Sequence, residues 1–396
     1  MKKIKPSLMM LFVVMLLLAA CSNSGNDKTS STNNASTSNN ASSSAAVDTA
    51  VTESITVNQD LPQKEILSKG PNGELAVSAK SLELTVEEIK QIKDKKLTAA
   101  IAMHYAGNDW STAQIQGLQD TFAKMGVEVV AVTDAQFKSE KQVADIETIL
   151  AKKPDILVSI PVDAISTAAV YKQAAEQGVK IVFMDNAPFG LEAGKDYVSV
   201  VSADNYGNGI EAAHILADKL NGEGDIAVIY HDADFFVTKQ RVEAFEATIT
   251  ENYPNINIVD RGGIADQNQG ETVAAALLTR NAKLDGMFVV WDVPAEGALA
   301  AVKSSGRDLV MTTIDLGTNV AIEIAKNGII QGLGAQLPYD QGVAEAILAG
   351  YSILEKEAPP YVAVPALDVT HDNVIDAWQL VYHQDAPESV KSAYKQ

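Results

Sequence analysis

From residue 97 onward the chain alternates short apolar runs with longer amphipathic stretches. Runs of strand length lie at 97–103, 127–132, 155–160, 180–184, 197–201, 225–230, 256–260, 286–290, 309–314 and 331–336. Stretches with apolar residues three and four positions apart lie between most of them, at 111–125, 139–152, 163–177, 206–220, 237–251, 268–280, 294–305, 318–327 and 339–355. This alternation predicts parallel sheets covered by helices on both faces. Because so many strands exceed one small sheet, we expect an α/β protein with two doubly wound lobes.

The N-terminus has the pattern of an export signal. Lys2, Lys3 and Lys5 precede an apolar run at 8–20 that is too short to span a bilayer comfortably. The stretch LAAC at 18–21 resembles a lipobox, which implies a signal peptide at 1–20 and lipidation of Cys21. We therefore expect an exported protein, lipid-anchored to the outer face of the cell membrane. An ordinary signal peptide with a chance cysteine is the alternative.

The next segments differ from the alternating body in composition. Residues 21–46 are mostly Ser, Asn, Thr, Ala and Gly, which predicts a flexible linker. Residues 47–96 are mixed, and we expect a poorly determined arm with one short helix at 84–93. Thr85 would cap that helix, with Glu88 three residues further on. The globular body is then expected to begin near Lys96.

Charge and motif content argue against several kinds of function. With 31 basic and 51 acidic residues the net charge is −20, which disfavours nucleic-acid binding. Cys21 is the only cysteine, and the five histidines lack zinc-site spacing. The stretch GNGIEA at 207–212 has the outline of a dinucleotide fingerprint, but Asp204, Asn205 and Tyr206 separate it from the preceding strand. We read its small residues as helix-packing positions, and we expect no metal and no cofactor.

Polar and aromatic side chains follow six of the predicted strands. Ligands bind beyond the carboxyl ends of strands in such sheets, so these residues are candidates for one site. The exits carry Asn108, Trp110, Asp185, Asn186, Arg241, Trp291, Asp292, Asp315 and Gln336. Any single Asp or Asn could be a helix N-cap, but Trp, Arg and Gln are poor caps. The series therefore predicts a binding site.

This mixture of side chains suits a neutral polyhydroxylated ligand. Carboxylates accept hydrogen bonds, amides donate and accept, and an arginine donates through a fixed fork. Flat aromatic rings can cover the C–H face of a sugar, and Trp110 and Trp291 are expected to form an aromatic clamp from opposite lobes. His104, Phe236 and Asp292 are further candidates for ligand contact. Phe235 and Phe236 could equally fill the seam between the lobes.

From about Leu97 to its end the chain resembles the type I periplasmic sugar-binding proteins, the ribose-binding-like receptors of ABC importers. The matching motifs are NDWSTAQIQG, VFMDNAP, VVSADNYGNG, KQRVEAF, VVWDVPAEGALAAV, TIDLG and GAQLPYDQG. The resemblance implies ligand binding by Asn108, Trp110, Asp185, Arg241, Trp291, Asp315 and Gln336. Ser111 and Asn186, at positions that depart from the family pattern, are further candidates for ligand binding.

Several of these positions depart from the pattern of ribose binders. Ser111 stands where they often carry a second aromatic, Asn186 where they carry Arg, and Trp291 where they usually carry Asn. Ala265 stands where an aromatic is often found. The ligand is therefore left open among ribose, xylose, other aldoses, acyclic polyols, inositols and a furanosyl autoinducer.

The resemblance also implies two lobes joined by three crossings, near 202–204, 335–337 and 368–371. Lobe one would comprise 97–203 plus 337–369, and lobe two 204–336 plus 370–396. A ligand that bridges the lobes would stabilise the closed form, which would deliver it to an ABC permease. We expect a monomer that catalyses no reaction. A sensor for a chemoreceptor or kinase is one alternative, and a carbohydrate-modifying enzyme using Asp185, Asp292 and Asp315 is another.

Overall fold

The computed structural model describes residues 52–395. The predicted signal peptide at 1–20, Cys21, the linker at 21–46 and the start of the arm at 47–51 lie outside the described residues. No helix within 52–395 is both long enough and apolar enough to span a bilayer.

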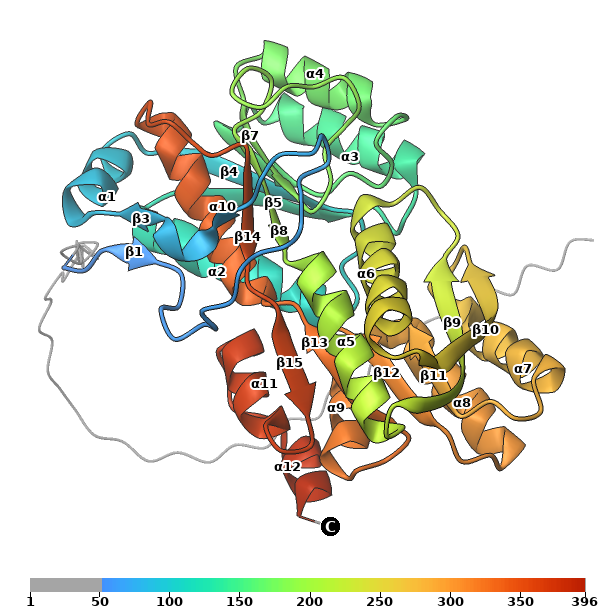
Figure 1. Ribbon diagram of the computed structural model, residues 1–396. Coiled ribbons are helices and arrows are strands. Elements are labelled where there is room, and N and C mark those ends of the chain that lie inside the picture. Colours follow the sequence, from blue (N-terminus) through green and yellow to red (C-terminus); the bar gives the residue numbers. More distant parts are fainter. Residues whose placement is uncertain (1–51, 396) are drawn as a thin grey trace, which may run out of the picture. The chain divides into compact units, whose positions relative to one another are not determined.

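The first lobe is built on a seven-stranded sheet in which every pair of neighbours is parallel (Figure 1). Its order is β2 (Val77–Ser78), β14 (Tyr361–Val364), β8 (Ser199–Ala203), β7 (Lys180–Met184), β6 (Ile156–Ser159), β4 (Thr98–Met103) and β5 (Glu128–Asp134). Its main helices are α2 (Asp109–Met125), α3 (Ser139–Ala151), α4 (Ala168–Glu176) and α10 (Pro338–Ile353). Alternate residues of β4 point to opposite faces: Ile101 packs with the core under α2 and α10, and Ala102 with the core under α3 and α4.

The second lobe is built on a six-stranded sheet. Its order is β10 (Asn255–Ile264), β9 (Glu223–His231), β11 (Gly286–Val289), β12 (Val310–Ile314), β13 (Ile330–Ala335) and β15 (Leu367–Thr370). Only β15 is antiparallel to its neighbour among these described strands. The helices are α5 (Asn205–Lys219), α6 (Phe236–Asn252), α7 (Gly270–Arg280), α8 (Asp292–Ser305), α9 (Thr318–Ala325), α11 (Val374–Tyr382) and α12 (Glu388–Tyr394). In each sheet the chain goes from β4 or β9 to the edge strand beside it, β5 or β10, and then returns to the other side of β4 or β9, so helices cover both faces.

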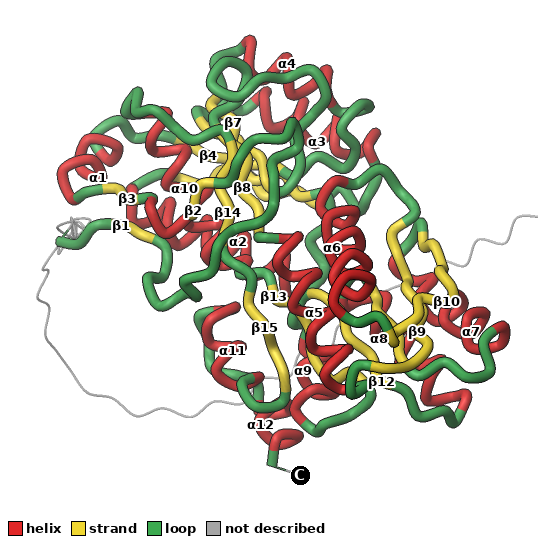
Figure 2. Tube along the Cα trace, in the orientation of Figure 1, coloured by secondary structure: helices red, strands yellow, loops and turns green. Residues whose placement is uncertain are grey.

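All ten predicted strands are present, and Figure 2 shows their alternation with helices. Four of them run beyond their predicted ends: β5 to Asp134, β8 to Ala203, β9 to His231 and β10 to Ile264. Of these, β5 and β10 are edge strands, whose exposed positions carry polar residues that ended the apolar runs early. The short strands β14 and β15 were not predicted. The prediction relied on strands alternating with helices, and no helix lies between these two strands. Trp378 is buried in the core.

The chain passes between the sheets three times. It crosses after β8, at Asp204, and again between β13 and α10. The third crossing lies between Val364 and Leu367, not near 368–371 as expected. The reason is that β15 pairs with β13, so residues 367–369 belong to the second sheet.

The expectation of a poorly determined arm is wrong for residues 52–96, which belong to the same compact unit as the two sheets. β1 (Ile55–Thr56) pairs with β3 (Glu83–Leu84), and β2 extends the first sheet. A short 3-10 helix, η1, spans Ala79–Ser81. Helix α1 (Val86–Lys93) begins at the predicted capping box of Thr85 and Glu88.

The arm also reaches each of the three crossings. Ser68 donates through its backbone N and its Oγ to Asp204 Oδ1, both at 2.9 Å. Asn58 N donates to Asp340 Oδ1 at 2.7 Å, and Lys64 Nζ donates to Asp368 Oδ1 at 2.8 Å. The arm therefore runs across the hinge and hydrogen-bonds to an aspartate beside each crossing.

One of the two glycines of GNGIEA, Gly209, serves helix packing, as the sequence suggested. Both glycines lie in the first turns of α5, which packs against α6, but Gly207 lies against the side chains of Asp204 and Ala366. A Cβ on Gly209 would lie 2.3 Å from the carbonyl oxygen of Arg241 in α6. A larger side chain there would push the two helices apart, and Arg241 with them.

Candidate ligand-binding site

A cavity of about 460 Å³ lies where the carboxyl ends of strands from both sheets meet. From the first lobe it is lined by His104, Tyr105, Asn108, Trp110, Gln136, Phe137, Ile160, Val162, Asp163 and Asp185. From the second lobe it is lined by His231, Ala233, Asp234, Phe235, Val237, Thr238, Arg241, Ala265, Asp266, Gln267, Asn268, Trp291 and Asp315. Gln336, at the second crossing, completes the wall.

Eight of the predicted site residues are in this wall. They are His104, Asn108, Trp110, Asp185, Arg241, Trp291, Asp315 and Gln336. They come from six strand exits far apart in the sequence, and the two doubly wound sheets bring them together. The rule that ligands bind beyond the carboxyl ends of parallel strands accounts for this convergence.

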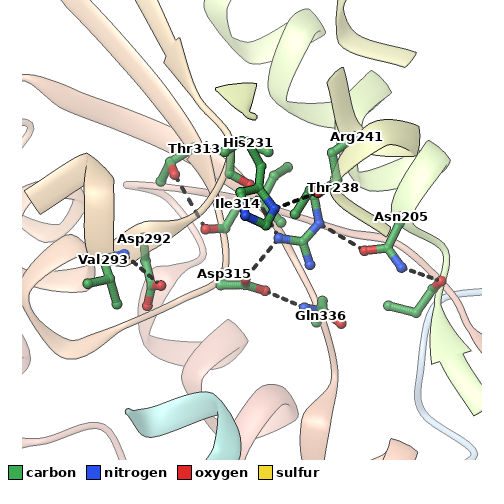
Figure 3. Close-up of polar contacts among 12 residues, drawn as sticks. Asn205, His231, Thr238, Arg241, Asp292, Val293, Thr313, Ile314, Asp315 and Gln336 are labelled. Atoms are coloured by element: carbon green, nitrogen blue, oxygen red, sulfur yellow. Dashed lines mark hydrogen bonds and ion pairs between the residues drawn. The ribbon is translucent and has the colours of Figure 1, made fainter. Parts of the chain in front are cut away.

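Buried hydrogen bonds join the polar residues of the wall (Figure 3). Asp315 accepts from Arg241 Nη1 at 3.1 Å and from Gln336 Nε2 at 2.9 Å. Arg241 Nε donates to Asn205 Oδ1 at 2.9 Å. The side chain of Arg241 is 4% exposed, so its charge is balanced mainly by Asp315.

Asp185 and Asp315 occupy matching places in the two lobes. Asp185 follows β7 and has φ 55°, and Asp315 follows β12 and has φ 72°. Non-glycine residues seldom adopt this left-handed conformation, and they concentrate at functional sites when they do. In both lobes the turn points the carboxylate towards the cavity.

Burial shifts the protonation of several wall residues. It raises the pKa of Asp185 to about 6, although the Ser202 hydroxyl and the charge of Arg241 oppose the shift. Burial lowers the pKa of His104 to about 3, so this imidazole is neutral at pH 7. Burial and the nearby Arg241 also lower the pKa of His231. The wall therefore presents neutral imidazoles, one guanidinium and two inner carboxyl groups.

Aromatic rings from both lobes enclose the cavity. The rings of His104 and Phe235 face each other across the lobes, with centroids 6.2 Å apart and planes 8° from parallel. Trp110 meets His104 edge-on at 6.1 Å, and Trp291 meets His231 edge-on at 5.2 Å. The two predicted tryptophans thus lie on opposite lobes, each backed by a histidine.

Ser111 and Asn186 do not line the cavity, contrary to expectation. Ser111 is fully buried and contributes to the N-cap of α2: its Oγ donates to the carbonyl oxygen of Asn108 at 3.1 Å, and its N donates to Asn108 Oδ1 at 3.0 Å. Asn186 is 5% exposed, and its Oδ1 accepts from the N of Ala187 at 3.1 Å. Local backbone capping therefore uses both side chains. Asn108 is a cap as well, but it remains in the cavity wall.

Phe236 and Asp292 are also outside the wall. Phe235, the residue before α6, lines the cavity in place of Phe236. Asp292 is 3% exposed and its side chain packs against Gly317. A Cβ added to Gly317 would lie 2.3 Å from Asp292 Oδ2. Burial and the neighbouring charge of Asp315 raise the pKa of Asp292 well above its usual range.

Three groups of wall residues follow strands whose exits were not predicted, and His231, Asp234 and Thr238 were missed at an exit that was predicted. Gln136 and Phe137 follow β5, Val162 and Asp163 follow β6, and Asp266 to Asn268 follow β10. The strand-exit rule would have found all three groups. For β5 and β10 the predicted strands end before the true strand exits. Within 52–395, no cluster of three or more His, Cys, Asp or Glu side chains could hold a metal ion.

Two doubly wound parallel sheets, three crossings and a cavity between the lobes define the type I periplasmic binding protein fold. Residues 99–358 match the family model described as periplasmic binding protein domain, so the chain belongs to that family.

Curated relatives and solved structures agree with this assignment. The ribose import binding protein RbsB of Bacillus subtilis is 28% identical over 244 residues, covering 62% of this chain and 77% of the relative. RbsB of Salmonella typhimurium is 26% identical, covering 71% of this chain and 93% of its own. A periplasmic solute-binding protein of an ABC transporter from Actinobacillus succinogenes, solved with bound D-allose, has TM-score 0.64 and 25% identity, covering 71% of this chain and all of its own.

Proposed function

We propose that this protein captures a sugar or polyol between its two lobes and delivers it to an ABC importer. The observation that carries the proposal is the composition of the cavity wall. It combines aromatic rings from both lobes with Asp185, Asp315, Arg241 and Gln336, the donor and acceptor set that a polyhydroxylated ligand requires.

Unpaired polar atoms in the wall support a ligand rich in hydroxyl groups. Trp110 Nε1, His104 Nδ1 and Gln336 Oε1 are buried without a hydrogen-bond partner among the described residues. An unpaired buried polar group costs about 1–3 kcal/mol, so a ligand that pairs with these atoms recovers that free energy. Hydroxyl groups both donate and accept, and can satisfy the indole N–H and the amide oxygen alike.

The experiment is a thermal-shift screen of the purified protein against pentoses, hexoses, tetritols, pentitols and inositols. At least one compound should raise the melting temperature in a concentration-dependent way, because a ligand that binds only the folded state stabilises it. Isothermal titration calorimetry then measures its affinity. No shift with any of these classes would contradict the proposal.

The same proposal covers location and partners. The chain would be exported, lipidated at Cys21, anchored to the outer face of the membrane and active as a monomer beside its permease. Replacing Cys21 by Ser should move the protein from the membrane fraction to the soluble extracytoplasmic fraction, as measured by fractionation and immunoblotting. Membrane retention of the variant would rule out the anchor.

The sensor and enzyme alternatives have less support. A receptor that presents its ligand to a chemoreceptor or kinase would use the same cavity, and genes for a permease and an ATPase beside this one would favour transport. An enzyme would need paired catalytic carboxyl groups, but Asp292 lies outside the cavity wall and Asp315 is held by Arg241 and Gln336. Turnover of the bound sugar would revive that alternative.

A further inference from the structure

Asp185 and Arg241, two charged residues of the cavity wall, belong to different lobes. Asp185 follows β7 of the first sheet, and Arg241 lies on α6 of the second lobe. A path of buried hydrogen bonds joins them. Ser202 Oγ donates to Asp185 Oδ1 at 2.7 Å, Asn205 Nδ2 donates to Ser202 Oγ at 2.9 Å, and Arg241 Nε donates to Asn205 Oδ1 at 2.9 Å.

Asn205 is the central residue of this path. It is fully buried, does not line the cavity, and is the first residue of α5, next to the first crossing. Its amide presents a donor and an acceptor in fixed directions, so it sets the orientation of both the Ser202 hydroxyl and the Arg241 guanidinium. A carboxylate at this position could accept from Arg241 but could not donate to Ser202.

We propose that Asn205 is a positioning residue for ligand binding. It holds Arg241, and through Ser202 also Asp185, in the orientations that the ligand meets, without touching the ligand itself. This inference rests on the proposed function. Because Asn205 lies at a crossing, where hinge rotation displaces atoms least, the path persists as the lobes move. The wall residues are therefore oriented before the ligand arrives, which lowers the free-energy cost of binding.

A second buried asparagine on the same helix gives a matched control. Asn208 lies in the next turn of α5 and is also fully buried. Neither polar atom of its side chain has a hydrogen-bond partner in the described part of the chain. Asn205 and Asn208 are thus both buried asparagines of α5, but of the two only Asn205 hydrogen-bonds to Arg241 and Ser202.

The test compares Asn205→Ala, Asn205→Asp and Asn208→Ala by isothermal titration calorimetry. The titrant is whichever of D-ribose, D-allose, xylitol and myo-inositol binds the unaltered protein most tightly. Asn205→Ala should raise Kd about 10-fold or more, because hydrogen bonds that orient two charged groups are lost. Asn205→Asp should also weaken binding while keeping a partner for Arg241, and hence the fold. Asn208→Ala should bind within about 2-fold of the original, as expected for a site outside the path.

A double-mutant cycle checks that the path acts as a unit. Ser202→Ala and Asn205→Ala should each weaken binding, and the double variant should be little worse than either single variant. Fully additive effects, or an Asn205→Ala variant that binds like the original, would overturn the inference.

A measurement without ligand separates this inference from the proposed function. Carboxyl carbon-13 NMR of the ligand-free protein follows the titration of Asp185, with Asp185→Asn used to assign the signal. The pKa of Asp185 should rise in Asn205→Ala, because the Ser202 hydroxyl and Arg241 no longer hold their positions. Arg241, Asp315, Glu345 of α10 and Tyr361 of β14 also interact with Asp185, and none of them is substituted. An unchanged titration would overturn the inference, whatever the screen shows.

Discussion

At the scale of single residues, Trp110 joins two roles that usually fall to different side chains. It is only 8% exposed and belongs to the core under α2, yet it also lines the cavity. Its Nε1 has no hydrogen-bond partner within residues 52–395. Trp110 therefore packs in the core next to the cavity wall, and its indole N–H can donate a hydrogen bond to a ligand.

Replacing Trp110 should separate these roles. Trp110→Ala should abolish ligand-dependent thermal stabilisation and lower the free energy of unfolding by about 3–5 kcal/mol, the usual cost of a large aromatic cavity. Trp110→Phe keeps most of the packing but removes the donor, so it should retain stability and lose part of the affinity. Thermal-shift and calorimetric titrations measure both effects. Unchanged ligand-dependent stabilisation of Trp110→Ala would contradict its assignment to the site.

Asp185 should make ligand binding depend on pH. Its pKa in the folded, ligand-free protein is about 6, against an ordinary value of 3.8, so the carboxyl gains a proton as the pH falls through 6. Ligand hydroxyl groups donate to the ionised form, so binding lowers this pKa and affinity falls as the pH falls. Between pH 7 and pH 5 we expect a loss of up to about 10-fold, measured by calorimetry. Asp185→Asn should bind more weakly and with a flat profile over this range. A sloped profile in Asp185→Asn would assign the dependence to another group.

At the scale of elements, the arm formed by residues 52–96 lies outside the stretch that matches the family model, residues 99–358. Its ends belong to the first lobe through β1, β2 and α1, while Lys64 between them bonds Glu211 on α5 and Asp368 on β15 of the second lobe. The arm therefore ties the two lobes together across the crossings.

Ser68 is the most buried link between the arm and a crossing. Its Oγ donates to Asp204 and accepts from the N of Tyr206, both at 2.9 Å. Ser68→Ala should lower the free energy of unfolding by about 1–3 kcal/mol, because the Tyr206 N–H loses its partner in a buried setting. Urea denaturation measures the change. Ser81→Ala, which removes an exposed hydroxyl of the same arm, should change stability by less than about 0.5 kcal/mol. Equal losses in the two variants would mean that the arm contributes only general packing.

At the scale of the whole molecule, a direct contact joins the lobes across the cleft. Asp109, the first residue of α2, accepts from Thr318 N at 2.8 Å and from Thr318 Oγ1 at 2.7 Å. Thr318 begins α9, whose N-cap, Gly317, has no side chain to cap the helix. A carboxylate from the first lobe thus caps a helix of the second, and it also complements the positive end of that helix.

Opening of the hinge would break this contact, so it should contribute to affinity through the closure equilibrium. Asp109→Ala should weaken binding about 3- to 10-fold without altering the cavity wall, because the closed form loses about 1 kcal/mol of capping. Calorimetry measures the affinity, and small-angle scattering should show a more open ligand-free protein. Asp120→Ala on the same helix serves as control, since Asp120 bonds Gln116 and Tyr339 within the first lobe. Equal effects from both variants would contradict a role in closure.

Most of the architecture and much of the cavity wall could be predicted from the sequence. Hydrophobic periodicity is a local property, so the alternation of strands and helices could be predicted residue by residue. The rule for parallel sheets then pointed to eight wall residues, including Asp185, Arg241 and Asp315. At Ser111 and Asn186 local hydrogen bonding to the backbone competes with ligand contact, because the same polar side chain can serve either purpose.

The remaining features depend on the packing of distant segments in three dimensions. The pairing of β15 with β13, the course of the arm over the crossings and the contact of Asp109 with Thr318 join residues far apart in the chain. The path from Asp185 through Asn205 to Arg241 is likewise a matter of side-chain direction inside a packed core. Such contacts produce no periodic pattern in the sequence, because they depend on how the folded sheets and helices bring distant residues together.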